Sequence, residues 1–240
     1  MSNFVLVAGA WLGSWAWDEV GPGLREAGHG VHPLTLSGLA ERQDEPAAGV
    51  AGQKTHVQDI VGEVERLDLR DVVLVGHSYS GIPVGQAAER IGGRLQRVVF
   101  VDASVPVDGE SFVSTWWQGP DQLQAALDAN GGMWEPLTAP DCEGQELTGE
   151  QIARLTGGAT PHPGASLAEA AVLERPLGEL PATYIKCLLD GADPQGDAAE
   201  LLAGSDRWRL VEMDTGHWPM FSRPRELARI LVDEAARDGH

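Results

Sequence analysis

Cysteine is scarce in this chain of 240 residues, and long apolar runs are missing. Its two cysteines, Cys142 and Cys187, provide neither a disulfide framework nor a metal-binding spacing, which favours a reducing compartment. We therefore expect a cytoplasmic protein. No run is long enough to cross a bilayer, and residues 1–3 lead straight into an apolar strand without the basic region of a secretory signal. These absences predict that no membrane is a partner.

Positive charge is also scarce, with 17 Lys and Arg against 36 Asp and Glu and a net charge of −19. Such an acidic chain is a poor partner for nucleic acid or for an anionic membrane surface. We expect a small molecule as its partner, with no cofactor and no metal, and leave homodimerisation open. Lysine is nearly absent while arginine is common, which we attribute to codon bias.

Short apolar runs alternate with helical patterns along most of the chain, which predicts an α/β fold with a mainly parallel sheet of about six strands. Strands are expected at residues 4–7, 31–36, 72–75, 97–102, 182–188 and 208–213, and helices at 15–27, from 55, at 81–91 and at 223–236. The stretch 106–180 is different, because it is rich in Gly, Pro and Trp and shows no strand-like run. We interpret it as an inserted, mostly helical cap (lid) with helical pieces near 121–129, 148–155 and 166–174, over a core of 1–105 and 181–240.

The chain is organised around the sequence GHSYSG at residues 76–81, which lies between a buried strand and a helix. A strand, a tight glycine-rich turn and a helix form a nucleophile elbow, which exposes the serine hydroxyl in a strained conformation. Ser78 is the predicted nucleophile. The usual pattern is G-x-S-x-G, but here Ser80 stands where the last glycine is expected, and its role is open.

A serine hydroxyl needs a base within hydrogen-bond reach and an acid that orients the base. His217 and Asp190 follow late predicted strands, and the order Ser78, Asp190, His217 is the one described for α/β-hydrolases. Asp102, which ends the strand after the elbow, is the main alternative acid, and Asp193 and Asp214 also sit near strand ends. His77 is expected to point into the turn and is not the predicted base.

The oxyanion of an acyl-transfer reaction needs two positioned donors. One is the backbone N–H of Tyr79, directly after the nucleophile. We place the other at Ala10, in the glycine-bearing loop that follows the first strand.

Together these motifs resemble the α/β-hydrolase superfamily, in particular the branch of plant salicylate-binding methyl esterases, hydroxynitrile lyases and their bacterial esterase relatives. The likeness covers most of the chain outside the cap and is carried by residues 4–7, 9–11, 28–29, 38–42, the elbow, 184–190 and 216–217. The family places its acid six residues after the tyrosine that matches Tyr184, which implies Asp190.

Departures from the family narrow the expected activity. Family members usually carry a histidine where this chain has Ala8, so its task in the oxyanion loop is done otherwise here. The similar lyases use a threonine and a lysine at the positions of Gly9 and Trp218 to manage cyanide. Ester hydrolysis is therefore favoured over lyase chemistry.

The predicted function is a serine carboxylic-ester hydrolase of the carboxylesterase type that acts through an acyl-enzyme on a small to medium, largely apolar or aryl ester. One alternative is a lactonase or specialised-metabolite ester hydrolase with the same residues, and another is a noncatalytic small-molecule binder on the same fold. The expected substrate-binding residues are mainly the aromatic side chains of the cap and the site loops, namely Trp11, Leu12, Trp116, Trp117, Met133, Trp134, Trp218 and Phe221.

Overall fold

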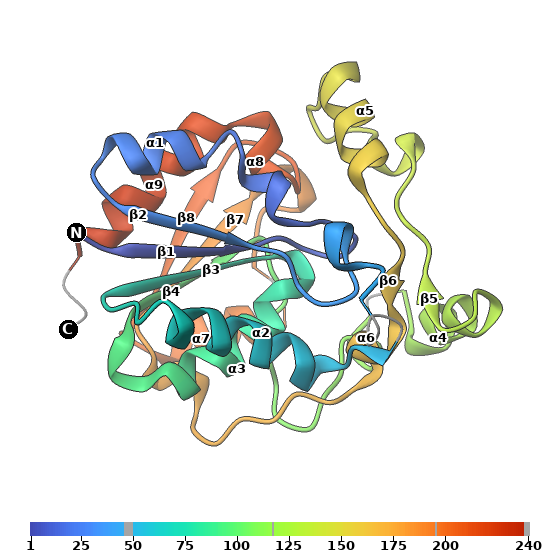
Figure 1. The fold of residues 1–240 in the computed structure, drawn as a ribbon, viewed down its shortest axis with the longest axis horizontal. Coiled ribbons are helices and arrows are strands. Elements are labelled where there is room, and N and C mark those ends of the chain that lie inside the picture. The colour runs from blue at the N-terminus through green and yellow to red at the C-terminus, as the bar shows by residue number, and fades with distance from the viewer. Residues whose placement is uncertain (46–49, 117, 195, 238–240) are drawn as a thin grey trace.

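Six parallel strands form the central sheet of the computed structural model, which describes residues 1–45, 50–116, 118–194 and 196–237 (Figure 1). The sheet confirms the predicted fold class, and its strand order is β2-β1-β3-β4-β7-β8. The strands are β1 (Asn3–Val7), β2 (Gly30–Leu34), β3 (Val72–His77), β4 (Leu95–Val101), β7 (Ala182–Cys187) and β8 (Trp208–Met213).

Helices cover both faces of this sheet, which explains why the central strands β1 and β3 are apolar runs without alternation. In β1, Val5 and Val7 pack into one core and Phe4 and Leu6 into the other, all fully buried. The first core includes α2 (Gln53–Arg66), α3 (Gly81–Ile91) and α7 (Asp197–Gly204), and the second includes α1 (Gly21–Glu26), α8 (Pro219–Ser222) and α9 (Pro224–Ala235).

The single helix expected over residues 15–27 is wrong. A 3-10 turn at Ser14–Trp17 precedes the short α1, which carries Pro22 in its first turn. Proline has no N–H to donate within a helix, so it begins a helix here and does not continue one. The helices α7 and α8 were not predicted, because each is short and follows a loop rich in Gly, Asp or Pro.

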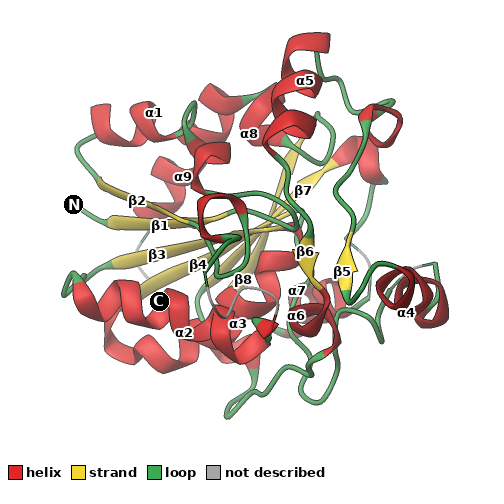
Figure 2. Cartoon of the chain, turned by 45° about the vertical axis from the view of Figure 1, so that its right-hand side comes forward, coloured by secondary structure: helices red, strands yellow, loops and turns green. Residues whose placement is uncertain are grey.

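The segment between β4 and β7 lies outside the sheet (Figure 2). It contains α4 (Pro120–Ala129), α5 (Gly149–Gly158) and α6 (Gly164–Ala168), which ends earlier than expected. The expectation of no strand there is corrected by β5 (Met133–Trp134) and β6 (His162–Pro163), a two-residue antiparallel pair too short to leave a pattern in the sequence. Within the described residues, no helix is both long and apolar enough to cross a membrane.

Candidate active site

The elbow lies at the end of β3, where Ser78 has a φ of 54°. This left-handed conformation is strained for serine. Ser78 lines a cleft that opens at this end of the sheet. The turn Ser78–Ser80 leads directly into α3. Gly81 allows α3 to approach the end of β4, because a Cβ there would collide with the carbonyl oxygen of Ser104.

Ser80 stabilises this turn through hydrogen bonds to the backbone. Its hydroxyl accepts the backbone N–H of His77 at 2.9 Å and donates to the carbonyl of Val7 at 2.8 Å. The side chain is fully buried and does not line the cleft. The serine that replaces the expected glycine therefore ties β3 to β1.

His217 reaches Ser78 from the loop after β8. Its Nε2 atom lies 2.9 Å from the Ser78 hydroxyl oxygen, within hydrogen-bond distance for proton transfer. The buried His77 supports the loop of His217, since its Nε2 atom donates to the backbone carbonyl of His217 at 2.7 Å. Burial, aided by the neighbouring His217, keeps the pKa of His77 well below its usual value, so His77 is neutral.

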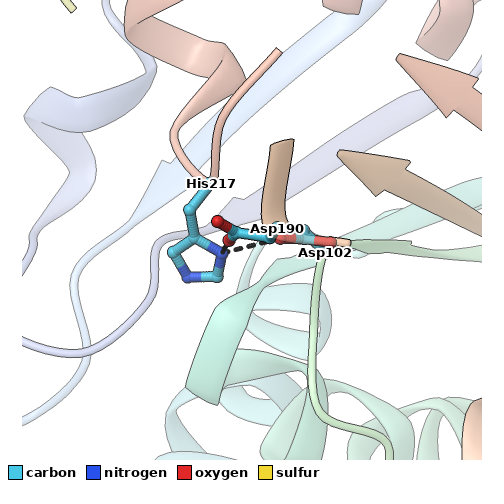
Figure 3. A group of neighbouring side chains, drawn as sticks. All are labelled: Asp102, Asp190 and His217. Carbon is cyan, nitrogen blue, oxygen red and sulfur yellow. Dashed lines mark hydrogen bonds and ion pairs between the residues drawn. The ribbon is translucent and has the colours of Figure 1, made fainter. Parts of the chain in front are cut away.

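Two carboxylates, not one, face the other nitrogen of His217 (Figure 3). The Nδ1 atom lies 2.8 Å from Oδ2 of Asp102 and 3.1 Å from Oδ2 of Asp190. Asp102 directly follows β4, and Asp190 ends the 3-10 turn that follows β7. β4 and β7 are neighbours in a parallel sheet, so their carboxyl ends bring both acids to one place. The predicted acid and its alternative thus occupy the site together.

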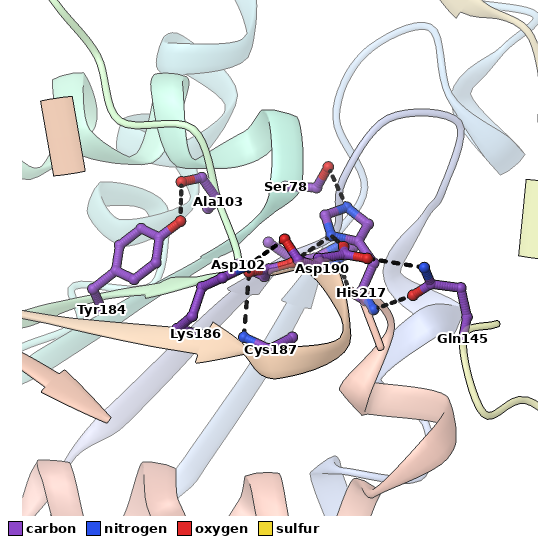
Figure 4. A network of polar contacts seen from close by, with 10 residues as sticks. Ser78, Asp102, Ala103, Gln145, Tyr184, Lys186, Cys187, Asp190 and His217 are labelled. Carbon is purple, nitrogen blue, oxygen red and sulfur yellow. Dashed lines mark hydrogen bonds and ion pairs between the residues drawn. The ribbon is translucent and has the colours of Figure 1, made fainter. Parts of the chain in front are cut away.

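Each carboxylate has its own polar partner (Figure 4). The ammonium group of Lys186 lies 2.8 Å from Oδ1 of Asp102, and both side chains are buried. Gln145 donates its amide N–H to Oδ1 of Asp190 at 2.9 Å, and its Oε1 atom accepts the backbone N–H of His217 at 2.5 Å. These partners keep two like charges stable beside one imidazole.

The electrostatics of the site favour a charged imidazole. Burial alone would lower the pKa of His217, but hydrogen bonds to Asp102 and Asp190, together with their charges, raise it to about 9. Burial also opposes the charge of Asp190, yet hydrogen bonds from His217 and Gln145 hold the pKa of Asp190 well below its usual value. Both effects stabilise the ion pair that forms when His217 takes a proton.

The first loop packs directly on the elbow. A Cβ on Gly9 would lie 2.8 Å from the Cβ of Ser78, so only glycine permits this approach. Ala10 lines the cleft beside Ser78. The next amide, that of Trp11, donates to Nδ1 of His162 at 3.3 Å and is therefore engaged. The amides of Ala10, in this loop, and of Tyr79, directly after Ser78, stay the predicted oxyanion donors. Ala8 itself is buried in the second core.

A cleft of about 1040 Å³ opens above Ser78 and His217. Trp11, Trp116, Trp134 and Trp218 line it, and the rings of Trp11 and Trp134 have centroids 4.1 Å apart. These four residues are among the eight expected to bind substrate.

Other expected binding residues lie elsewhere. Leu12 and Phe221 are corrected to core positions, since they are 2% and 1% exposed and belong to the second core. Met133 does not line the cleft, because neighbouring residues of a strand point to opposite sides and Trp134 takes the cleft side. Trp117 lies outside the described residues.

Sequence reasoning missed Lys186, Gln145 and His162. A lone lysine within a strand resembles an edge residue, and the two others lie between β4 and β7 without any motif. Acidic residues also line the cleft, namely Glu135, Asp141, Asp193 and Asp197, and of these only Asp193 was considered as a site residue from the sequence.

The ligand atoms of Asp102, Asp190 and His217 lie within 4.8 Å of one another, a spacing that also suits a metal ion. However, the ammonium group of Lys186 already sits on Asp102, which disfavours a second cation. The two carboxylates are instead well arranged to hold the imidazolium of His217.

Known proteins show the same fold and similar sequences. A "Carbendazim hydrolyzing esterase" of Nocardioides sp. (strain SG-4G) is 32% identical over 97% of this chain and 99% of its own length. "Methyl jasmonate esterase 1" of Vitis vinifera is 28% identical, covering 96% of this chain and 95% of its own. An extracellular alpha/beta-hydrolase from a Paenibacillus species, described as homologous to tobacco salicylic acid binding protein 2, matches with a TM-score of 0.85 at 24% identity, covering 99% of this chain and 100% of its own.

These relatives confirm the predicted branch of plant methylesterases and their bacterial counterparts. The model of the Alpha/beta hydrolase family matches residues 4–230. With the parallel sheet, the strained serine and a match over nearly its whole length, this chain belongs to the alpha/beta hydrolase family.

Proposed function

We propose that this protein is a serine carboxylic-ester hydrolase that acts through an acyl-enzyme. One observation carries the proposal: an unbroken chain of contacts runs from the Ser78 hydroxyl through both nitrogens of His217 to Asp102 and Asp190. The esterase names of the relatives support the same reaction class.

In the first half of the reaction, the Ser78 oxygen attacks the ester carbonyl carbon, and the hydroxyl proton passes to Nε2 of His217. The carbonyl oxygen becomes an oxyanion, which accepts hydrogen bonds from the Ala10 and Tyr79 amides. The intermediate collapses, the bond to the alcohol oxygen breaks, and this oxygen takes the proton from Nε2. The alcohol leaves and an acyl-Ser78 ester remains.

In the second half, water attacks the acyl carbon and gives a proton to Nε2 of His217. Collapse of the new intermediate returns that proton to the Ser78 oxygen and releases the acid. In each half the imidazolium is stabilised by the two carboxylates. With Lys186 paired to Asp102, the cluster carries one surplus negative charge, which the imidazolium balances.

The substrate we propose is a small to medium apolar or aryl ester. Three tryptophans line the cleft together: the ring of Trp134 is tilted against that of Trp11 and packs edge-on against that of Trp116. Such aromatic walls suit a flat apolar part of a substrate. The names of the relatives point to a short alcohol such as methanol as leaving group. We further propose that residues 106–180 form the cap, because Trp116 and Trp134 reach the cleft from this segment.

We also propose that the protein is cytoplasmic. Cys142 and Cys187 are both free and buried, which supports a reducing, cytoplasmic environment.

Hydrolysis of a p-nitrophenyl ester by Ser78→Ala and His217→Ala tests the mechanism. We expect each variant to lose on the order of 10⁶ in kcat. Ser114→Ala, which changes an exposed serine of the cap, is the matched control and should keep full activity. Full activity in either site variant would refute the mechanism.

A fluorophosphonate probe tests the alternative of a noncatalytic binder. We expect one label per chain, located on Ser78 and absent from Ser78→Ala. A protein that binds aryl esters tightly but takes no label would be a binder. Comparison of linear esters with lactones then separates the two hydrolase alternatives.

A further inference from the structure

Every polar backbone group of Trp11 is held by the segment between β4 and β7. Its N–H donates to Nδ1 of His162 at 3.3 Å, and its carbonyl accepts the N–H of Thr160 at 2.9 Å. The indole N–H donates to the carbonyl of Trp134 at 3.2 Å. Trp11 has a φ of 67°, a left-handed conformation that bulky residues rarely adopt. Such a conformation persists where the surroundings determine it, and here the cap supplies them.

The contacts of His162 show which of its two ring nitrogens carries the proton. It is fully buried in β6, and its Nε2 atom lies 2.9 Å from the hydroxyl oxygen of Ser166. That hydroxyl donates its proton to the carbonyl of Pro163 at 2.8 Å, so its oxygen is free to accept. Nε2 therefore carries the ring proton, and Nδ1 is left bare to accept the Trp11 N–H.

The surroundings of His162 keep this ring neutral. The rings of His56 and Tyr79 pack edge-on against it, with centroids 5.9 Å and 4.6 Å away. Burial, with a smaller contribution from His56, holds the pKa of His162 well below its usual value. A charged ring would present a second N–H to the Trp11 amide and break the contact.

The contact matters because Trp11 directly follows Ala10. The bond to His162 fixes the peptide plane between these residues, and with it the backbone of Ala10 next to Ser78. It also occupies the Trp11 amide, so this amide cannot donate to an oxyanion, and the task falls to Ala10, which lines the cleft with Ser78. Resting on the proposed function, we propose that His162 is a positioning residue for the oxyanion hole, which holds the Ala10 amide through the Trp11 backbone.

Two polar substitutions distinguish the roles of the two ring nitrogens of His162. The side-chain oxygen of His162→Asn takes the place of Nδ1 and can accept the Trp11 N–H. The longer amide of His162→Gln takes the place of Nε2 and can meet only Ser166. If the Trp11 contact is the important one, His162→Gln should lose about 10- to 100-fold in kcat with little change in KM, while His162→Asn stays within about 5-fold of the unchanged protein.

A purely structural role through Ser166 predicts the reverse order. Equal kcat values for both variants, or a lower value for His162→Asn, would overturn the proposal. Inhibition by a trifluoromethyl ketone, whose adduct with Ser78 carries an oxyanion, should weaken for His162→Gln by about the same factor as kcat. Ser78→Ala, measured in parallel, separates the two hypotheses: if it stays active the esterase mechanism fails, and if it is inactive only the role of His162 is under test.

The protein without any substitution gives an independent test, which does not depend on the folding of a variant. Nitrogen-15 NMR of the histidine rings should show His162 as the neutral Nε2–H form from pH 5 to pH 9. A ring that carries its proton on Nδ1, or that becomes charged in this range, would refute the proposal.

Discussion

The two carboxylates that face Nδ1 of His217 predict that either acid can partly replace the other. Replacement of Asp102 or Asp190 by asparagine removes one charge beside Nδ1 and leaves the other in place. Each single variant should therefore retain a base of the correct tautomer. The double variant should not, because no anion then holds the proton on Nδ1.

The geometry sets the expected order of the losses. In a triad with a single acid, the asparagine variant loses about 10⁴ in kcat, or about 5 kcal/mol. Asp102 lies closer to Nδ1, at 2.8 Å against 3.1 Å, and its side chain is 5% exposed against 28% for Asp190. Since a buried charge acts through a lower dielectric, we expect losses of about 100-fold for Asp102→Asn and about 10-fold for Asp190→Asn. The double variant should lose about 10⁴, more than the product of the two single losses.

Lys186 complicates the change at Asp102. Its side chain is 7% exposed, and removal of its partner leaves a buried charge that costs about 3–5 kcal/mol of stability. Asp102→Asn should therefore be measured both alone and combined with Lys186→Met in a double variant. Lys186→Met alone is the control. Thermal unfolding separates the loss of stability from the loss of rate.

Single-turnover acylation by a p-nitrophenyl ester, measured well below the unfolding temperature, is the appropriate assay. A loss of about 10⁴ for Asp190→Asn, with Asp102→Asn in the Lys186→Met background almost unaffected, would refute redundancy. Asp190 would then be the sole acid, and Asp102 would serve only to hold Lys186.

Three further predictions concern pH, the elbow and the cap. Only a neutral His217 can take the proton from Ser78, and the pKa of His217 is raised to about 9, so kcat/KM should rise with pH up to about 9. In Asp102→Asn this rise should move to lower pH. A pH profile of kcat/KM that is flat above pH 7 would contradict this prediction. Ser80→Ala removes two hydrogen bonds of a buried hydroxyl and should cost about 1–3 kcal/mol in urea unfolding without changing KM, whereas a changed KM would indicate substrate contact. Gln145→Ala removes a donor to Asp190 and should lower kcat about 10-fold, and unchanged rates would mean that the cap does not support the acid.

Much of the site could be predicted from the sequence because its signals are local. The turn at Ser78 depends on small residues that directly follow a buried strand, and strand and turn together lie within residues 72–81. His217 could be found because the ends of parallel strands meet at one edge, so that a histidine after a late strand lies near the elbow. The same reasoning predicted the sheet and most of its helices.

The choice of acid could not be made in this way. The sequence offered Asp190 and Asp102 as alternatives, and the pairing of β4 with β7 brings both to Nδ1. Whether two like charges can share one imidazole depends on Lys186 and Gln145, whose positions follow from the register of β7 and the path of the cap.

The sequence by itself determined the fold and predicted the nucleophile, the base and the oxyanion donors, because each rests on a motif or on strand order. Only the tertiary structure decided that Leu12 and Phe221 belong to the core, that Ser80 ties β3 to β1, and that His162 reaches Trp11. These contacts join residues that are far apart in the chain, and a cap without periodic pattern gives no sign of which side chain will meet the site.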